Sequence, residues 1–129
     1  MSSDHVVFSS SKFPVEPGED EETNPGIYGK ALATWVAAKL KERGVPVKRI
    51  VAEDFGRCVM VRNWPFMLWI GCANLDGDTA RWQLCVTLEW GFIARFFGRN
   101  EVQTELDRLR EHLRAIVQDI PGATDIEWQ

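Results

Sequence analysis

The sequence has few of the residues from which metal sites and disulfide frameworks are built. It contains two histidines and three cysteines in 129 residues, and no two cysteines have a C-x-x-C spacing. An odd, scattered set of cysteines is not typical of a disulfide scaffold or a zinc site. Because Cys58, Cys72 and Cys85 each lie in an apolar stretch, we expect free structural thiols and no metal ion. His112 falls among leucines of a helical pattern, where we interpret it as a helix-edge residue.

Long hydrophobic runs are also missing. No apolar stretch approaches the roughly 18 residues of a membrane-spanning helix. The first residues, MSSDH, lack the basic and apolar regions of a secretory signal. Phosphate-binding glycine loops, nucleophile-elbow serines and paired zinc-protease histidines are absent as well. We therefore predict a cytoplasmic protein that does not associate with membranes, and we assign no catalytic residues and no cofactor.

Positive charge is scarce overall but concentrated in one segment. The chain has a formal net charge of −4. Residues 30–62 carry eight basic and three acidic side chains, whereas residues 1–29 carry one lysine and six acidic side chains. Surface lysines of a helix explain most of the basic segment, and no nucleic-acid motif accompanies it. The balance argues against nucleic acid as a partner.

The residues that are present predict a folded globular chain. Apolar residues make up 45% and charged residues 26% of the sequence, as in ordinary globular proteins. We predict a single domain over residues 1–129, with residues 1–24 as a partly irregular N-terminal arm. Serines, prolines and the acidic run 19–22 populate this arm. The run lacks the spacing of a calcium loop, so we expect it to be solvated or to place negative charge before a helix.

Two amphipathic helices are predicted, at about residues 25–43 and 101–119. Asn24 is a good N-cap for the first, Pro25 suits the first helical position, and Gly44 ends it. The second is expected to follow a cap at Asn100. Each helix has one apolar stripe, which needs a sheet face to cover.

Four strands between the helices form a predicted antiparallel meander. They span about residues 47–53, 57–62, 66–72 and 81–90, and their connections are too short for parallel crossovers. A short strand at 6–8 would add to one edge of the sheet, and residues 125–128 would form either a last short strand or a docked tail. Residues 91–99 are ambiguous between a strand extension and a connector. The fold class is α+β, a two-layer sandwich in which both helices cover one face of a four- to six-stranded antiparallel sheet.

Two features suggest where a ligand or partner binds. Glu53 and Asp54 precede a turn beside Arg57, where paired carboxylates support acid–base chemistry, although a solvated turn is the favoured interpretation. Tryptophan is abundant, with six copies, and Trp64 lies in a turn. An exposed aromatic patch on the uncovered sheet face is one expectation. Its members would come from Phe66, Trp69, Phe92, Phe96 and Phe97. The equally weighted alternative is that the N-terminal arm and C-terminal tail cover this face.

Three segments resemble a known family. The stretch 19–35 (EDEETNPGIYGKALATW), the turn 53–56 (EDFG) and the stretch 68–74 (LWIGCAN) are similar to a family of small bacterial proteins of unknown function. The resemblance implies a bacterial cytoplasmic origin and a compact α+β fold, and it supplies no catalytic residues. The family usually has an aromatic residue after the turn, where this chain has Arg57. We expect the three segments to build one surface.

We predict a non-enzymatic protein-binding module of the adaptor or immunity type. The candidate binding residues are Glu53, Asp54, Arg57, Trp64, Trp69 and Asn74. One alternative is a dimer that resembles a secretion chaperone. The other is a small-molecule binder or enzyme that uses the turn at 53–57 with Arg62, Arg81 or Glu89. The expected partner is another protein, with a homodimer as a further possibility.

Overall fold

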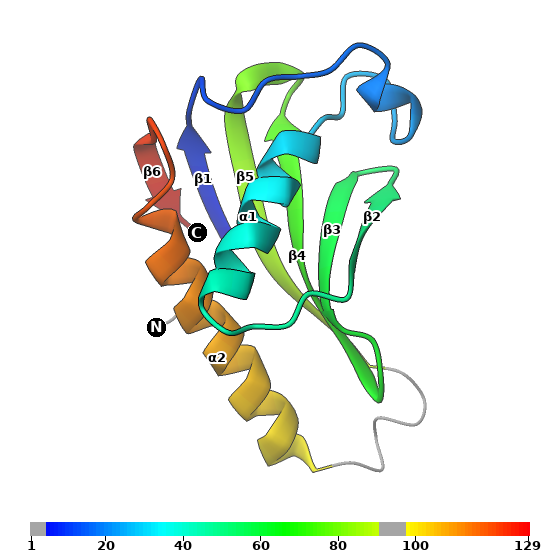
Figure 1. Cartoon of the computed structure of the whole chain (residues 1–129), viewed down its shortest axis with the longest axis vertical. Helices are drawn as coiled ribbons and strands as arrows, with labels where there is room; N and C mark the ends of the chain where they lie inside the picture. Colours follow the sequence, from blue (N-terminus) through cyan, green and yellow to red (C-terminus); the bar gives the residue numbers. More distant parts are fainter. Residues whose placement is uncertain (1–4, 91–97) are drawn as a thin grey trace.

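A six-stranded antiparallel sheet with two α-helices on one face makes up the fold (Figure 1). The computed structural model describes residues 5–90 and 98–129. The strands are β1 (His5–Ser9), β2 (Arg49–Glu53), β3 (Gly56–Arg62), β4 (Phe66–Leu75), β5 (Asp78–Trp90) and β6 (Thr124–Trp128). The helices are the short 3-10 helix η1 (Glu19–Glu21), α1 (Lys30–Glu42) and α2 (Arg99–Val117). The predicted α+β two-layer sandwich is confirmed.

The strand order is β2-β3-β4-β5-β1-β6, and every neighbouring pair is antiparallel. The predicted meander from β2 to β5 is present. Its third hairpin turns at Asp76–Gly77, whose φ angles of 51° and 74° are those of the turn that an Asp-Gly pair favours. The N-terminal strand was predicted to lie at an edge, and this prediction is wrong: β6 pairs with the side of β1 that β5 leaves open.

The main core lies between the sheet and the two helices. Side chains at alternating positions of the central strands meet the apolar stripes of both helices. Representative members with no more than 1% exposure are Leu32, Val36, Leu40, Val59, Ile70, Leu84, Leu113 and Ile116. Trp82 is also buried, and its indole N–H donates a hydrogen bond to the Ser10 carbonyl at 3.1 Å.

Helix α1 begins at Lys30, five residues later than predicted. The backbone around Asn24 forms a turn instead, in which the Asn24 carbonyl accepts a hydrogen bond from the Ile27 N–H at 2.9 Å. Gly26 and Gly29, at φ of 81° and 149°, then take the chain out of the helical region. Helix α2 begins at Arg99, after Gly98, which is earlier than predicted. The predicted cap residue, Asn100, therefore lies inside the first turn.

The N-terminal arm packs on the helix side of the sheet. The Phe13 ring contacts the rings of Phe8, Trp35 and Trp82, with centroids 6.0 to 6.4 Å apart. The tail pairs with β1 and extends the sheet as β6. The alternative expectation was that the arm and the tail cover the opposite sheet face. Their described residues have other roles, since the arm packs on the helix side and the tail extends the sheet.

Candidate functional site

The six predicted binding residues lie in separate places. Glu53 and Asp54 are exposed at the β2–β3 turn. Arg57 and Asn74 are buried beside the N-terminal arm. The two tryptophans lie elsewhere, Trp69 on the sheet face opposite the helices and Trp64 in the β3–β4 loop. No single site contains all six residues, so each location is described in turn.

Glu19, Arg57 and Asn74 form a buried group that we call the cap network. Glu19 is 5% exposed, although the acidic run that contains it was expected to be solvated. Its Oε2 accepts hydrogen bonds from the N–H groups of Gly29 and Lys30 at 3.0 and 3.1 Å. Those are N–H groups at the start of α1, which have no partner within the helix. Glu19 therefore caps α1 from outside the helix, in agreement with the alternative expectation of negative charge at that point.

The pKa of Glu19 reflects two opposing effects. Burial raises the pKa of this carboxyl, but hydrogen bonds from three backbone N–H groups and the charge of Arg57 lower it by more. The net result is a pKa below the ordinary value of 4.5. Glu19 is therefore ionised at neutral pH, and its negative charge faces the positive end of the α1 dipole.

Arg57 and Asn74 hold the arm against strands β3 and β4. The Arg57 Nη2 donates to the Glu19 carbonyl at 3.1 Å, and Nη1 forms an ion pair with Glu22 at 3.3 Å. Asn74 accepts a hydrogen bond from the Tyr28 N–H at 2.8 Å and donates one to the Gly26 carbonyl at 3.0 Å. These contacts occupy both terminal nitrogens of Arg57 and the side-chain amide of Asn74, and they give both residues a structural role. The buried Arg57 Nε has no hydrogen-bond partner among the described residues.

Two glycines let the same segments approach closely. A Cβ atom at Gly29 or at Gly56 would lie 2.5 Å from the carbonyl oxygen of Cys72. Their φ angles of 149° and 148° also favour glycine. The segments 19–35, 53–56 and 68–74 thus meet, as expected, but around the buried cap network.

The predicted carboxylate turn does not form the expected cluster. Glu53 and Asp54 are exposed, whereas Arg57 points into the cap network. Between them, Phe55 stacks on Trp69 with ring centroids 5.7 Å apart. The two carboxylates thus lie on a solvated turn, which was the favoured interpretation. The stacking of Phe55 on Trp69 anchors this turn to the sheet.

Neither described member of the predicted exposed aromatic patch is exposed. Trp69 lies on the face opposite the helices with Cys58 and Met60, and it is 9% exposed. Its ring lies beside Gly71, where a Cβ atom would be 3.1 Å from Trp69 Cζ3. Phe66 belongs to the main core instead. The other predicted members, Phe92, Phe96 and Phe97, lie outside the described residues.

The three cysteines are present as thiols, as predicted. Burial, with smaller contributions from Glu53 and Glu89, raises the pKa of the Cys58 thiol to about 12. Burial also raises the pKa of Cys72. Both thiols are therefore protonated at neutral pH, and a protonated thiol is a poor nucleophile.

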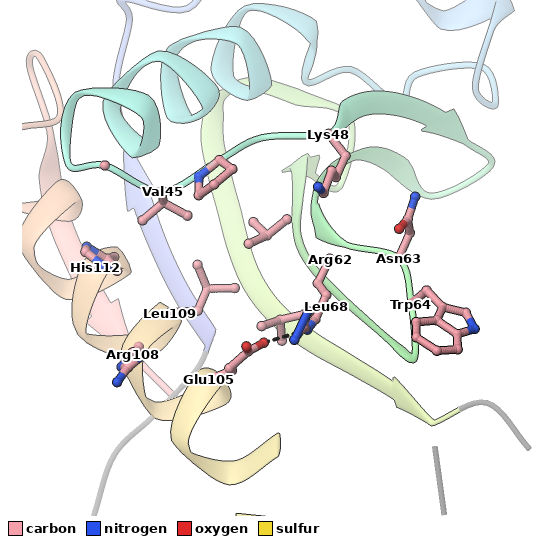
Figure 2. Close-up of a pocket in the computed structure, with 13 residues that line it drawn as sticks. Val45, Lys48, Arg62, Asn63, Trp64, Leu68, Glu105, Arg108, Leu109 and His112 are labelled. Carbon is pink, nitrogen blue, oxygen red and sulfur yellow. Dashed lines mark ion pairs between the residues drawn. The ribbon is translucent and has the colours of Figure 1, made fainter. Parts of the chain in front are cut away.

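A groove of about 430 Å³ lies between α2 and the β3–β4 end of the sheet (Figure 2). The loop after α1, the end of β3 and one face of α2 line it. The residues are Gly44, Val45, Pro46, Lys48, Val61, Arg62, Asn63, Trp64, Leu68, Glu105, Arg108, Leu109 and His112. Trp64 is 62% exposed, the largest value among the large apolar side chains that the structure describes.

The polar lining of the groove is mainly cationic. Lys48, Arg62 and Arg108 contribute positive charges, and Glu105 is the one carboxylate. Glu105 forms an ion pair with Arg62 at 2.7 Å (Figure 2). Within residues 5–90 and 98–129, Lys48 and Arg108 form no ion pair. The groove therefore has excess positive charge in a chain whose net charge is −4.

His112 adds an uncharged donor to this lining. Its Nδ1 accepts a hydrogen bond from Arg43 Nε at 2.9 Å. Burial and the charge of Arg43 lower the pKa of His112, so the ring is neutral at pH 7. Its Nε2 then has the proton.

Of the six predicted binding residues only Trp64 lines this groove, and Arg62, which the sequence suggested for a small-molecule alternative, lines it too. The other lining residues come from segments that are far apart in the chain, and their proximity depends on how α2 crosses the sheet. The basic segment 30–62 was a usable signal, because it supplies Lys48 and Arg62. Because most of that charge was assigned to surface lysines of the first helix, the sequence did not point to this groove.

Comparison with known proteins gives no relative. No family model matches the chain, and no curated protein or solved structure is significantly similar to it. In the part of the chain that is described, no three His, Cys, Asp or Glu side chains gather as a metal site would require. The described helices also include none long and apolar enough to cross a membrane.

Proposed function

We propose that the protein is a non-enzymatic protein-binding module, of the adaptor or immunity type, which binds an acidic segment of a partner protein in the groove between α2 and the β3–β4 loop. The observation that carries this proposal is that an exposed tryptophan lies in the same groove as two cations that form no ion pair within the described residues. Trp64 is 62% exposed, and Lys48 and Arg108 lie on the same lining without carboxylate partners among the described residues.

This combination fits a peptide-like segment of another protein. Tryptophan and arginine are the residues most enriched at the energetic centres of protein interfaces. The Arg62–Glu105 ion pair fixes one guanidinium between α2 and β3, and that guanidinium also lies 4.9 Å from the Phe66 ring centroid. A carboxylate of the partner would bind Arg108 or Lys48, and an apolar side chain beside it would pack on Trp64.

The alternative at the β2–β3 turn has less support. An acid–base site there would use Glu53 and Asp54, but both are solvent-exposed and neither lines the groove. A cytoplasmic location and a bacterial origin are parts of the same proposal, supported by the free cysteines and by the family resemblance.

A site-specific photo-crosslinker tests the proposal and identifies the partner. It replaces Trp64 in cells that produce the protein, and Phe55, which is 52% exposed at another place, serves as the control position. We expect position 64 to capture a defined protein with an acidic segment that position 55 does not capture. Equal capture at the two positions would contradict the proposal.

A charge reversal then tests the recognition chemistry. Arg108→Glu should reduce binding of the captured segment by at least about tenfold, and glutamine in place of the segment's carboxylates should have a similar effect. Lys41→Glu makes the same change of charge on an exposed position of α1 and should leave binding nearly unchanged. If the two reversals weaken binding equally, or if an oligonucleotide competes better than the acidic segment, the proposal fails.

A further inference from the structure

Among the described strands, β2 leaves one edge of the sheet open. It is the terminal strand in the order β2-β3-β4-β5-β1-β6, and β3 is its one neighbour (Figure 1). Ile50 in this strand is 39% exposed. An unpaired edge presents backbone N–H and C=O groups that can form a ladder with another strand.

The hairpin register shows which backbone groups point outward. Glu53 pairs with Gly56 across the two-residue turn formed by residues 54 and 55. The residues that close such a turn exchange both hydrogen bonds, and hydrogen-bonded and non-hydrogen-bonded pairs then alternate. Glu53 and Val51 therefore direct their backbone groups toward β3. Ile50 and Ala52 direct theirs toward solvent.

The sequence around this edge is complementary to itself. The segment from Val47 to Phe55 reads V-K-R-I-V-A-E-D-F, with two basic residues before the apolar centre and two acidic residues after it. Val51 is the midpoint. None of the four charged side chains, at positions 48, 49, 53 and 54, forms an ion pair within the described residues.

We propose that β2 pairs antiparallel with β2 of a second copy of this chain, about a two-fold axis at Val51. In this register Ile50 exchanges backbone hydrogen bonds with Ala52 of the other copy. Arg49 lies opposite Glu53 of the other copy. Two six-stranded sheets then form one continuous sheet.

A second copy fits this edge better than an unrelated strand. A two-fold interface requires a surface that complements itself, and the order of charges around Val51 meets that requirement. A parallel arrangement would bring like charges together, which is unfavourable across a strand pair. Because a single short strand pair gives a small interface, we expect a dissociation constant on the order of micromolar.

A charge exchange tests the register. In sedimentation velocity over a concentration series, Arg49→Glu and Glu53→Arg should each weaken dimerisation at least about tenfold. The double variant, which exchanges the two charges, should restore it. Lys41→Glu and Arg108→Glu, which reverse charges away from the edge, should dimerise like the unchanged chain, so this test is independent of the groove. A chain that stays monomeric at millimolar concentration, or a double variant no better than the single ones, would overturn the proposal.

A disulfide tests the position of the axis. At the centre of a non-hydrogen-bonded pair the two Cα atoms are about 4.5 Å apart, within the range of a disulfide. Val51→Cys should therefore crosslink two copies on mild oxidation, in a Cys58→Ala background because Cys58 is the intrachain neighbour of Val51. Ile50→Cys in the same background is the control, since position 50 faces position 52 and not itself. Equal crosslinking at 50 and 51, or none at 51, would contradict the proposed axis.

Discussion

At the scale of single residues, the burial of Glu19 gives one acidic side chain a role that its neighbours do not share. Its two carboxylate oxygens accept hydrogen bonds from the N–H groups of Glu16, Gly29 and Lys30. Its backbone carbonyl accepts a hydrogen bond from Arg57. One residue thus joins the arm and the start of α1 through its carboxylate, and strand β3 through its backbone carbonyl.

We predict that Glu19→Gln destabilises the protein by about 1–3 kcal/mol, because a neutral amide is a weaker acceptor for these N–H groups and has one fewer acceptor atom. Chemical denaturation at pH 7 measures this loss. Glu21→Gln, an exposed position in the same 3-10 helix, is the matched control and should change stability by less than about 0.5 kcal/mol.

The same variant has an expected pH dependence. The pKa of Glu19 is lower in the folded state than its ordinary value of 4.5. The ionised carboxylate therefore contributes stability that is fully present above a pH of about 4.5 and is lost as the pH falls through the lowered pKa. The difference between the unchanged chain and Glu19→Gln should therefore narrow below pH 4.5. A difference that stays constant with pH would show that the charge of Glu19 is not what stabilises α1.

At the scale of elements, the start of α1 shows what local sequence can and cannot predict. The apolar stripe and Gly44 predicted the body and the end of the helix, since both depend on neighbours within a few residues. The start depends on Glu19 and on the close approach of Gly29 to Cys72, which are contacts with other segments. The hairpins were predictable because they too depend on neighbours within a few residues. The groove was not, since α2 and β3 meet only in the folded chain.

We predict that Gly29→Ala costs more than about 2 kcal/mol. The new Cβ would lie 2.5 Å from a backbone oxygen, which cannot move without disturbing β4, and φ is 149°. Gly26→Ala is the control, because Gly26 also has a positive φ, of 81°, but has no atom within 4 Å of a Cβ. It should cost about 1 kcal/mol. Equal losses of thermal stability in the two variants would show that backbone strain, and not the contact with Cys72, fixes this glycine.

At the scale of the whole molecule, β1 lies between β5 and β6 and so joins the first and the last strand in the same sheet. Val6 lies opposite Leu84 of β5 and opposite Trp128 of β6. Val6 and Phe8 have no exposed surface, whereas the five residues of β6 are all exposed. The apolar pattern of β1 predicted a strand. Its interior position could not be predicted, because it depends on pairing with segments remote in sequence.

We therefore predict different results from two truncations. Removal of residues 1–9 should leave the chain unfolded, since it uncovers β5 and removes two fully buried side chains, each worth about 1.5–3 kcal/mol. Removal of residues 124–129 should leave a folded chain with a lower melting temperature. Circular dichroism with thermal unfolding measures both. A cooperative unfolding transition in the first variant would contradict the prediction.

The interior position of β1 also affects how the protein is made. A nascent chain leaves the ribosome N-terminus first, so β1 emerges before either strand that flanks it has been synthesised. Val6 and Phe8 remain uncovered until β5 has followed, and the outer side of β1 stays unpaired until residues 124–128 have emerged. The α1 helix and the hairpins from β2 to β5 can form as they emerge, but the sheet is completed only after residues 124–128 have left the ribosome. Until then, an apolar N-terminal strand is available to chaperones and to neighbouring nascent chains.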